Sequence, residues 1–199
     1  MTFENPYLEE VAGGVTVGAN RISWSQKVIN VLERREALVR EYAWAVPTRE
    51  AVETIVEYDP IVEIGAGTGY WAWCIDQLGG VVAATDIEPP ESTYRRVAAY
   101  DGRRRVNAMI PDEHDAALLM VWPPYTDPMA ADALNAYPGE TVIYVGEGRG
   151  GCTADDRFHR LLHEDWQLVE TVDIPTYLGL HDRLEVWRDP DVVSGGESA

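Results

Sequence analysis

The sequence predicts an α/β domain built on a doubly wound, mostly parallel sheet. From Pro60 onward, short apolar runs alternate with helical patterns, which is typical of parallel strands joined by covering helices. A glycine-rich loop stands directly after the first of these strands and before a helix. An acidic residue ends the second strand, at the edge of the sheet where that loop is expected to lie. We expect loop and acid to share one crevice.

Two helices are expected before the sheet. The first twenty residues contain three glycines and show no sustained period, so we expect them to wrap around the domain or to fray. A helical pattern of apolar residues covers residues 23–42. A second helix follows, which Thr48 can cap and which Asp59 and Pro60 end.

The elements of the sheet then follow in order. They are a strand at 61–64, a helix at 70–78, a strand at 81–85, a helix at 92–100, a short strand at 106–109, strands at 116–121 and 141–145, a helix that begins at Thr153, and strands at 166–174 and 183–188. In the late helix, Asp156 completes a Thr-x-x-Asp variant of the capping box with Thr153. The residues from Asp189 onward form a polar tail without a pattern.

Length, charge and cysteine content limit the classes of function. The 199 residues suit one domain, and 46% hydrophobic and 25% charged residues are typical of a globular protein. A net charge of −18 opposes binding to nucleic acid and to anionic membranes. No apolar run reaches the roughly 18 residues that cross a bilayer, and the amino terminus is acidic, so we expect a cytoplasmic protein. Cys74 and Cys152 are too few for a disulfide framework or a structural zinc site.

Basic and imidazole side chains each allow two interpretations. Five arginines form a local cluster that fits a solvated helix end and loop, or a patch for nucleic acid: Arg95, Arg96, Arg103, Arg104 and Arg105. His159 and His163 lie one turn apart, but no third ligand is apparent, so we interpret them as a helix surface pair and predict no metal site. His181 and Asp182 either reach the crevice or simply start the last strand.

The loop at residues 63–69 is the most informative segment. A ligand can approach its bare backbone, and the next helix offers free N–H groups at its amino end. Position 70 is Tyr, where a dinucleotide-binding fingerprint has glycine. Asp86 lies twenty-one residues after Gly65 and can accept hydrogen bonds from two ribose hydroxyls. The alternative is that Asp86 caps the turn at Pro89 and Pro90.

The run from Val62 to Gly69, together with Asp86, resembles motif I and the following acid of class I S-adenosylmethionine-dependent methyltransferases. The resemblance implies a Rossmann-like, seven-stranded, mostly parallel sheet with an antiparallel last strand. It implies a cofactor site in which glycines admit the methionine part, an acid before them orients it, the later acid holds the ribose and an aliphatic residue packs on adenine. These residues are Glu63, Gly65, Ala66, Gly67, Gly69, Asp86 and Ile87.

The same resemblance divides the chain into three parts. Residues 59–190 are expected to form the methyltransferase domain. Residues 1–58 are an amino-terminal extension whose helices pack on that core, and those at 23–58 are expected to line the opening of the site. Residues 191–199 are expected to be a flexible tail.

The fourth strand ends in Trp122-Pro123-Pro124-Tyr125, which is similar to the Asp/Asn-Pro-Pro-Tyr motif of methyltransferases that act on amino groups. An indole N–H donates and cannot accept, so the main polar anchor for an amine is missing. The Pro123 carbonyl and the Tyr125 ring can still frame a flat substrate, or the segment is only a rigid strand exit.

Two residues are candidates for catalysis, Tyr125 and Glu147. Glu147 follows the fifth strand within a glycine-rich turn, so it can be a general base, a substrate anchor or a solvated loop acid.

The predicted function is methyl transfer from S-adenosylmethionine to an unidentified small-molecule or protein acceptor. The alternative is a non-catalytic, S-adenosylmethionine-binding or regulatory protein with the same fold, since Trp122 departs from the motif and no base is assignable. A third hypothesis, nucleic-acid modification, rests on the arginine cluster and is opposed by the net charge.

Overall fold

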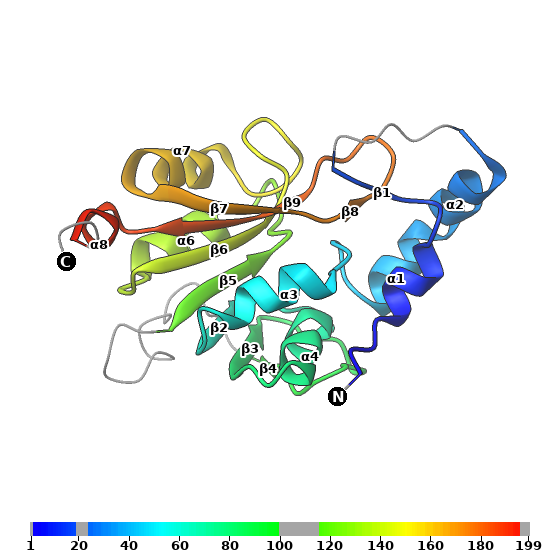
Figure 1. The fold of residues 1–199 in the computed structure, drawn as a ribbon, viewed down its shortest axis with the longest axis horizontal. Helices are drawn as coiled ribbons and strands as arrows, with labels where there is room; N and C mark the ends of the chain where they lie inside the picture. The colour runs from blue at the N-terminus through cyan, green and yellow to red at the C-terminus, as the bar shows by residue number, and fades with distance from the viewer. Residues whose placement is uncertain (1, 19–23, 100–115, 196–199) are drawn as a thin grey trace.

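A seven-stranded sheet runs through the protein in the computed structural model, which describes residues 2–18, 24–99 and 116–195 (Figure 1). Its strand order is β4-β3-β2-β5-β6-β9-β7, and every neighbouring pair is parallel except the two that include β9. The strands are β2 (Ile61–Ile64), β3 (Val82–Asp86), β4 (Ala98–Ala99), β5 (Ala117–Val121), β6 (Thr141–Gly146), β7 (Gln167–Asp173) and β9 (Arg183–Arg188). The predicted Rossmann-like sheet with an antiparallel last strand is confirmed.

The strand order reverses between β2 and β5. From β2 the chain proceeds outward to β3 and β4, whereas β5 and β6 lie on the other side of β2. In open α/β sheets, ligands bind outside the carboxyl ends of the strands at such a switch point. The glycine loop follows β2 directly, so the topology places it at this position.

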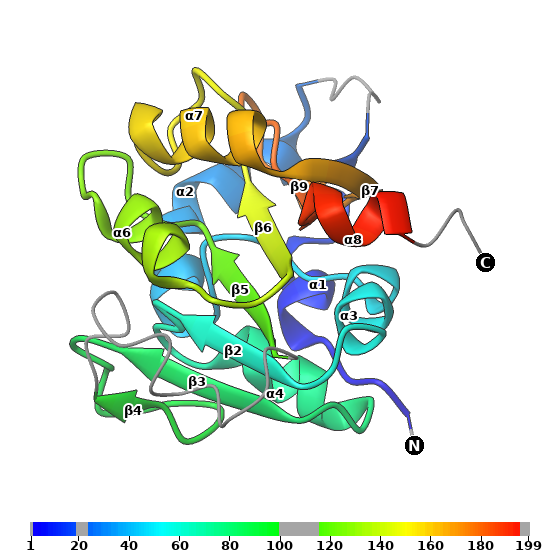
Figure 2. The same cartoon turned by 90° about the vertical axis from the view of Figure 1, so that its left-hand side faces the viewer.

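Helices cover both faces of the sheet (Figures 1 and 2). One face packs against α1 (Pro6–Val11), α2 (Gln26–Glu41), α3 (Arg49–Val56) and α4 (Tyr70–Gln77), and the other against α6 (Met129–Ala136) and α7 (Asp156–Asp165). Successive strand residues alternate between the two apolar clusters, as Ile61 and Val62 do in β2. Both helices predicted before the sheet are present, and the Thr48 hydroxyl accepts a hydrogen bond of 3.1 Å from the N–H of Ala51.

Of the two alternatives predicted for the first segment, wrapping around the domain or fraying, residues 2–18 adopt the first. Asn5 caps α1, and Tyr7 and Val11 are fully buried. A short strand, β1 (Thr16–Val17), pairs with β8 (Pro175–Thr176) in a separate two-stranded sheet. Tertiary burial of a few apolar residues therefore orders a stretch that has no long-range period.

Helix α6 was not predicted, and three predicted elements differ in the structure. Residues 92–99 form no helix, because Arg95 binds the carbonyl of Val82 and the carboxylate of Asp76, which holds this segment against the sheet. Asp155, not Thr153, caps α7. The start of the expected tail is a short helix, α8 (Pro190–Gly195). The strand predicted at 106–109 lies outside the described residues.

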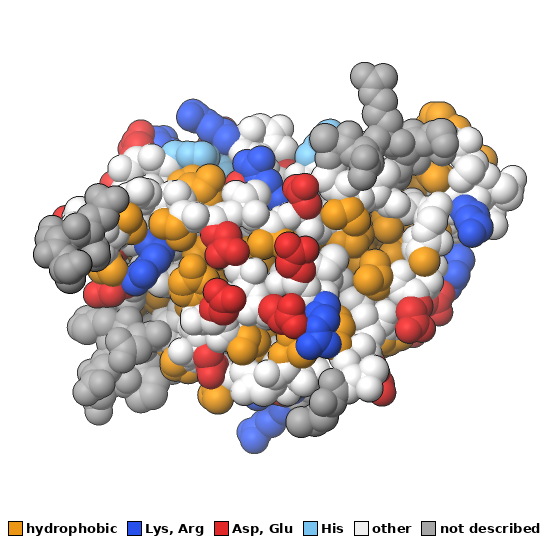
Figure 3. All heavy atoms as spheres, in the orientation of Figure 1, with side chains coloured by type: hydrophobic (Ala, Val, Ile, Leu, Met, Phe, Trp, Pro, Cys, Tyr) orange, Lys and Arg blue, Asp and Glu red, His pale blue; other side chains and the backbone are white. Residues whose placement is uncertain are grey.

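The surface is rich in acids. Figure 3 shows Asp and Glu side chains gathered near the middle of one face, in keeping with the net charge of −18. Within the described ranges, no helix has the length and apolar character needed to span a membrane.

Candidate cofactor and acceptor site

The glycine loop and the acid of β3 are in direct contact. The N–H of Gly67 donates a hydrogen bond of 2.9 Å to Oδ2 of Asp86. Oδ1 of Asp86 accepts a second hydrogen bond, of 2.9 Å, from the N–H of Glu88. A carboxylate offers about four lone-pair sites, so Asp86 keeps capacity for a ligand's hydroxyl groups.

Backbone conformation explains why the loop needs its glycines. Gly65, Gly67 and Gly69 have φ values of 73°, 51° and 70°, which residues with a Cβ rarely adopt. A Cβ added at Gly67 would meet nothing within 4 Å, so the loop is open there. At Gly69 a Cβ would meet Val97 at 2.8 Å, so this glycine serves packing and the start of α4.

Glu63 is a buried acid without a full set of partners. It is 1% exposed, and its Oε2 has no hydrogen-bond partner. The pKa of Glu63 is raised to about 8, chiefly by burial; the positive charge of Arg95 opposes the shift, and the negative charge of Asp86 contributes to it. An orphaned carboxyl oxygen at this position is suited to a cationic or N–H-bearing ligand.

A cavity of about 190 Å³, which we call the loop pocket, joins these groups. Its walls include the predicted residues Glu63, Gly65, Ala66 and Gly67. The carboxyl end of α2 and the segment after it supply Val39, Arg40, Tyr42, Ala43 and Trp44. The helical extension therefore lines the opening, as the sequence led us to expect. Asp86 contacts the loop through its hydrogen bond with Gly67, and the next residue, Ile87, is 58% exposed.

The Trp122 segment follows Val121, a residue of the loop pocket, and is held by contacts with neighbouring elements. Trp122 has a φ of 52°, which costs about 1–3 kcal/mol in a residue with a Cβ and is held by surrounding contacts. Its N–H donates to the carbonyl of Val145 at 2.7 Å, and its Nε1 donates to Oδ1 of Asp182 at 2.8 Å. Burial raises the pKa of Asp182 to about 6, and the Trp122 hydrogen bond works in the opposite direction.

The two prolines and the tyrosine are placed differently from one another. The Pro123 carbonyl, which could have received an amine, accepts a hydrogen bond of 2.8 Å from the N–H of Ala154. Pro124 forms an isolated β-bridge with Thr153. Tyr125 is 50% exposed and does not line the loop pocket. The segment thus ties the end of β5 to the loop after β6.

Sequence reasoning missed an aromatic cluster next to the loop pocket. The rings of Trp44 and Trp122 stack with centroids 4.8 Å apart. The guanidinium carbon of Arg35 lies 5.4 Å from the Trp44 ring centroid, 5.7 Å from that of Trp122 and 5.1 Å from that of Tyr177. These residues are far apart in the sequence and share no motif, so only the fold brings them together.

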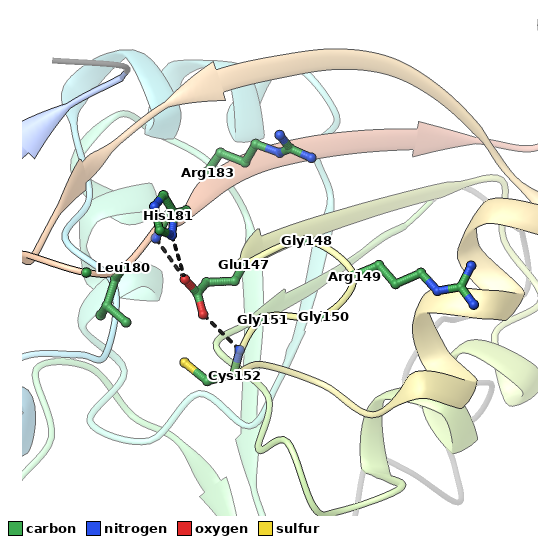
Figure 4. A pocket seen from close by; sticks show the side chains of 10 residues that line it. Glu147, Gly148, Arg149, Gly150, Gly151, Cys152, Leu180, His181 and Arg183 are labelled. Atoms are coloured by element: carbon green, nitrogen blue, oxygen red, sulfur yellow. Dashed lines mark hydrogen bonds and ion pairs between the residues drawn. The ribbon is translucent and has the colours of Figure 1, made fainter. Parts of the chain in front are cut away.

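Glu147 forms a second polar centre, shown in Figure 4. Its Oε1 accepts from the N–H of His181 at 2.9 Å and lies 3.3 Å from Nδ1 of that ring, and its Oε2 accepts from the N–H of Cys152 at 2.8 Å. Burial alone would raise the pKa of Glu147, but these hydrogen bonds outweigh it and lower the pKa. Glu147 is therefore a fixed, ionised acceptor and not a solvated loop acid.

The imidazole of His181 is oriented by this contact. When Nδ1 carries the proton and donates to Glu147, Nε2 is left as a proton acceptor. The His181 side chain is 85% exposed, so Nε2 is accessible. This arrangement can accept a proton from a bound molecule. Neither interpretation of His181 from the sequence, reaching the crevice or starting the last strand, indicated this contact with Glu147.

Glu147 and His181 border an open hollow of about 650 Å³, which we call the rim hollow. The loop after β6 and the connection from β8 to β9 form its walls (Figure 4). Its lining residues are Glu147, Gly148, Arg149, Gly150, Gly151, Cys152, Gly179, Leu180, His181 and Arg183.

The remaining polar clusters of the sequence have structural roles. Arg95 is paired with Asp76 at 2.5 Å, and Arg103 to Arg105 lie outside the described residues. One ring nitrogen of His159 lies 2.9 Å from the carbonyl of Thr153. Among the described residues, no group of three His, Cys, Asp or Glu side chains is placed to hold a metal ion.

The sheet order and the loop pocket at its switch point define the fold of class I methyltransferases. The chain is similar to magnesium protoporphyrin IX methyltransferase from Synechocystis PCC 6803, solved with bound SAM: the TM-score is 0.51 and the identity 11%, over 92% of this chain and 90% of that chain.

It is also similar to 1,6-didemethyltoxoflavin-N1-methyltransferase from Burkholderia thailandensis, solved with bound 1,6-didemethyltoxoflavin and S-adenosylhomocysteine. The TM-score is 0.51 and the identity 16%, over 88% of this chain and 94% of that chain. At these identities the likeness establishes the fold. No protein-family model and no curated protein matches the sequence.

Proposed function

We propose that the protein is an S-adenosylmethionine-dependent methyltransferase that acts on a small molecule. The proposal rests on the hydrogen bond of 2.9 Å between Gly67 N–H and Asp86 Oδ2. This contact brings the acid predicted to hold the ribose onto the loop predicted to hold the methionine part. Both structural neighbours carry S-adenosylmethionine or its demethylated product in their solved structures, which supports the same cofactor here.

The residues of the loop pocket fit such a cofactor. The unpartnered Oε2 of Glu63 suits the ammonium group of its methionine part, and the open side of Gly67 gives room for backbone approach. The pocket holds about 190 Å³, less than the roughly 300–1,000 Å³ of sites that enclose a whole ligand. We therefore assign it to the methionine end, with Asp86 and Ile87 left for the adenosine end.

The acceptor side is formed by the tryptophan pair and the rim hollow. When bound, the sulfonium cofactor supplies an electrophilic methyl group and leaves as a thioether. In our proposal Trp122 and Tyr125 offer flat surfaces to the acceptor, and Pro123 and Pro124 hold them in place. His181 Nε2 takes the proton that the acceptor atom loses as it bonds to the methyl carbon, and Glu147 orients that ring.

Several observations favour a small-molecule acceptor. The rim hollow has the volume of a small-molecule site. The two structural neighbours are named for small-molecule substrates. The acidic surface in Figure 3 disfavours nucleic acid. We further propose that residues 1–58 act as a cover for the methyltransferase domain at 59–190, since Val39, Tyr42 and Trp44 line the loop pocket.

Calorimetric titration with S-adenosylmethionine tests the proposal. We expect the wild type to bind, and Asp86→Ala to bind at least about tenfold more weakly, because both a ligand contact and the Gly67 hydrogen bond are lost. Glu88→Gln is the matched control, since its exposed carboxylate is two residues away, and it should bind as the wild type does. Failure of the wild type to bind, or equal affinity in Asp86→Ala, would contradict the proposal.

A second measurement separates an enzyme from a binding protein of the same fold. The wild type is incubated with S-adenosylmethionine and a small-molecule fraction of cell extract, and S-adenosylhomocysteine is quantified. Formation of this product requires methyl transfer. Binding without product formation in any fraction would favour the non-catalytic alternative.

A further inference from the structure

Contacts made by the Trp122 side chain link the rim hollow to the loop pocket. β5 and β6 are parallel neighbours, so the segments after them emerge at the same edge of the sheet. Trp122, at the end of β5, stacks on Trp44 of the loop pocket. Its Nε1 donates a hydrogen bond of 2.8 Å to Asp182, and the residue next to Asp182, His181, lines the rim hollow. The hollow and the tryptophan pair are thus linked through Asp182 and His181, although neither tryptophan lines the hollow.

The accessible charge of the rim hollow is positive. Its one acid, Glu147, is 6% exposed, and both of its oxygens accept N–H hydrogen bonds. Arg149 is exposed and forms no ion pair with any described residue. Arg183 uses Nε to bind Glu185 at 2.5 Å, which leaves its other nitrogens for the hollow.

The loop that carries Arg149 consists otherwise of glycines, Gly148, Gly150 and Gly151. The N–H of Gly151 donates a hydrogen bond of 2.9 Å to the carbonyl of Gly148, and Gly150 has a φ of 88°, as in a type II turn. Nη2 of Arg183 lies 3.4 Å from the position that a Cβ on Gly148 would take. The absence of side chains thus lets a guanidinium lie against the loop and lets a ligand reach its backbone N–H groups.

We propose that the rim hollow is the acceptor subsite and that it binds acceptors through an oxyanion, carboxylate or phosphate. Arg149 and Arg183 both line the hollow, and a planar guanidinium group matches the geometry of an oxyanion. This inference rests on the proposed methyltransferase function. It adds the charge class of the acceptor and the two residues that select it.

Inorganic phosphate, benzoate and neutral benzamide are suitable probes, followed through the amide NMR signals of Gly148, Gly150 and Gly151. We expect saturable shifts with phosphate and benzoate and none with benzamide. Arg149→Gln should weaken anion binding about tenfold, because one charge-assisted contact is lost from an exposed side chain that supports no other described group. Arg183→Lys should also weaken it, since the charge remains but the planar fork is lost.

Arg157→Gln is the matched control, because it removes the same charge from an exposed arginine of α7 that pairs with Asp132 outside the hollow. It should leave the anion affinity unchanged. The inference is overturned if neither anion gives saturable shifts, if benzamide binds as well as benzoate, or if Arg149→Gln and Arg157→Gln behave alike. Titration of the same samples with S-adenosylmethionine keeps the two proposals apart, since Arg149→Gln should bind it as the wild type does.

Discussion

Glu63 shows how a single buried residue can report on ligand binding. Its carboxyl group is fully desolvated, and this is the main reason that its pKa rises to about 8. The protonated form therefore predominates near neutral pH while the pocket holds no cation. A positive charge placed next to Oε2 favours the ionised form and lowers the pKa again.

We predict that cofactor binding near pH 7 releases about one proton, because Glu63 ionises to pair with the incoming ammonium group. Calorimetric titrations in phosphate and in Tris measure this release, since the two buffers take up protons with different heats. Glu63→Gln should give equal heats in both buffers after correction for dilution. If the wild type binds with equal heats in both buffers, the assignment of Glu63 to the ammonium group is wrong.

At the residue scale, the sequence was informative where residues are close together or follow a known spacing. Glu63, Gly67 and Asp86 could be placed in one crevice from their positions after two neighbouring strands. His181 could not be joined to Glu147 in this way. Its proximity to Glu147 depends on how the connection before β9 meets the loop after β6, which no local spacing encodes.

At the element scale, strands were predicted well and helix boundaries less so. Buried strands are short, continuous apolar runs, and those of β2, β5 and β6 are unmistakable. Helix α6 was missed because it is short and its buried positions are mostly alanine, which gives little hydrophobic period. The prediction that Thr153 caps α7 was wrong for a different reason. The Thr153 hydroxyl is buried and accepts from the N–H of Glu147 at 2.8 Å, so it cannot also cap the helix.

The cap of α7 gives a prediction at this scale. The Asp155 carboxylate accepts a hydrogen bond of 2.8 Å from the N–H of Phe158, so Asp155→Ala should lower the free energy of unfolding by about 1 kcal/mol. Asp156→Ala, one residue further along, removes the same charge without removing the cap and should have a smaller effect. Urea denaturation measures both. Equal losses in the two variants would assign the effect to charge at the helix terminus and not to the Asp155 hydrogen bond.

At the scale of the whole molecule, a cluster of tyrosines joins the amino-terminal segment to the sheet domain. Tyr7 of α1 stacks on Tyr42 with ring centroids 4.8 Å apart, and its hydroxyl lies 2.9 Å from that of Tyr177. The N–H of Tyr7 also donates a hydrogen bond of 3.1 Å to the hydroxyl of Tyr70 in α4. These contacts connect α1 with the end of α2, the start of α4 and the segment before β9. The same elements contribute residues to the loop pocket and the rim hollow, so α1 supports the site without lining either cavity.

We therefore predict that residues 2–58 and the sheet unfold together. Tyr7→Phe should cost about 1 kcal/mol, because the buried Tyr177 hydroxyl loses its partner, and Tyr7→Ala about 3–5 kcal/mol, because a large buried ring is removed. Urea denaturation followed by far-UV circular dichroism and by tryptophan fluorescence should give coincident transitions that shift together. Tyr125→Phe, at a half-exposed ring, is the control and should leave the midpoint nearly unchanged. A Tyr7→Ala protein whose main transition stays at the wild-type midpoint would show that α1 detaches independently and that the extension is no part of the cooperative fold.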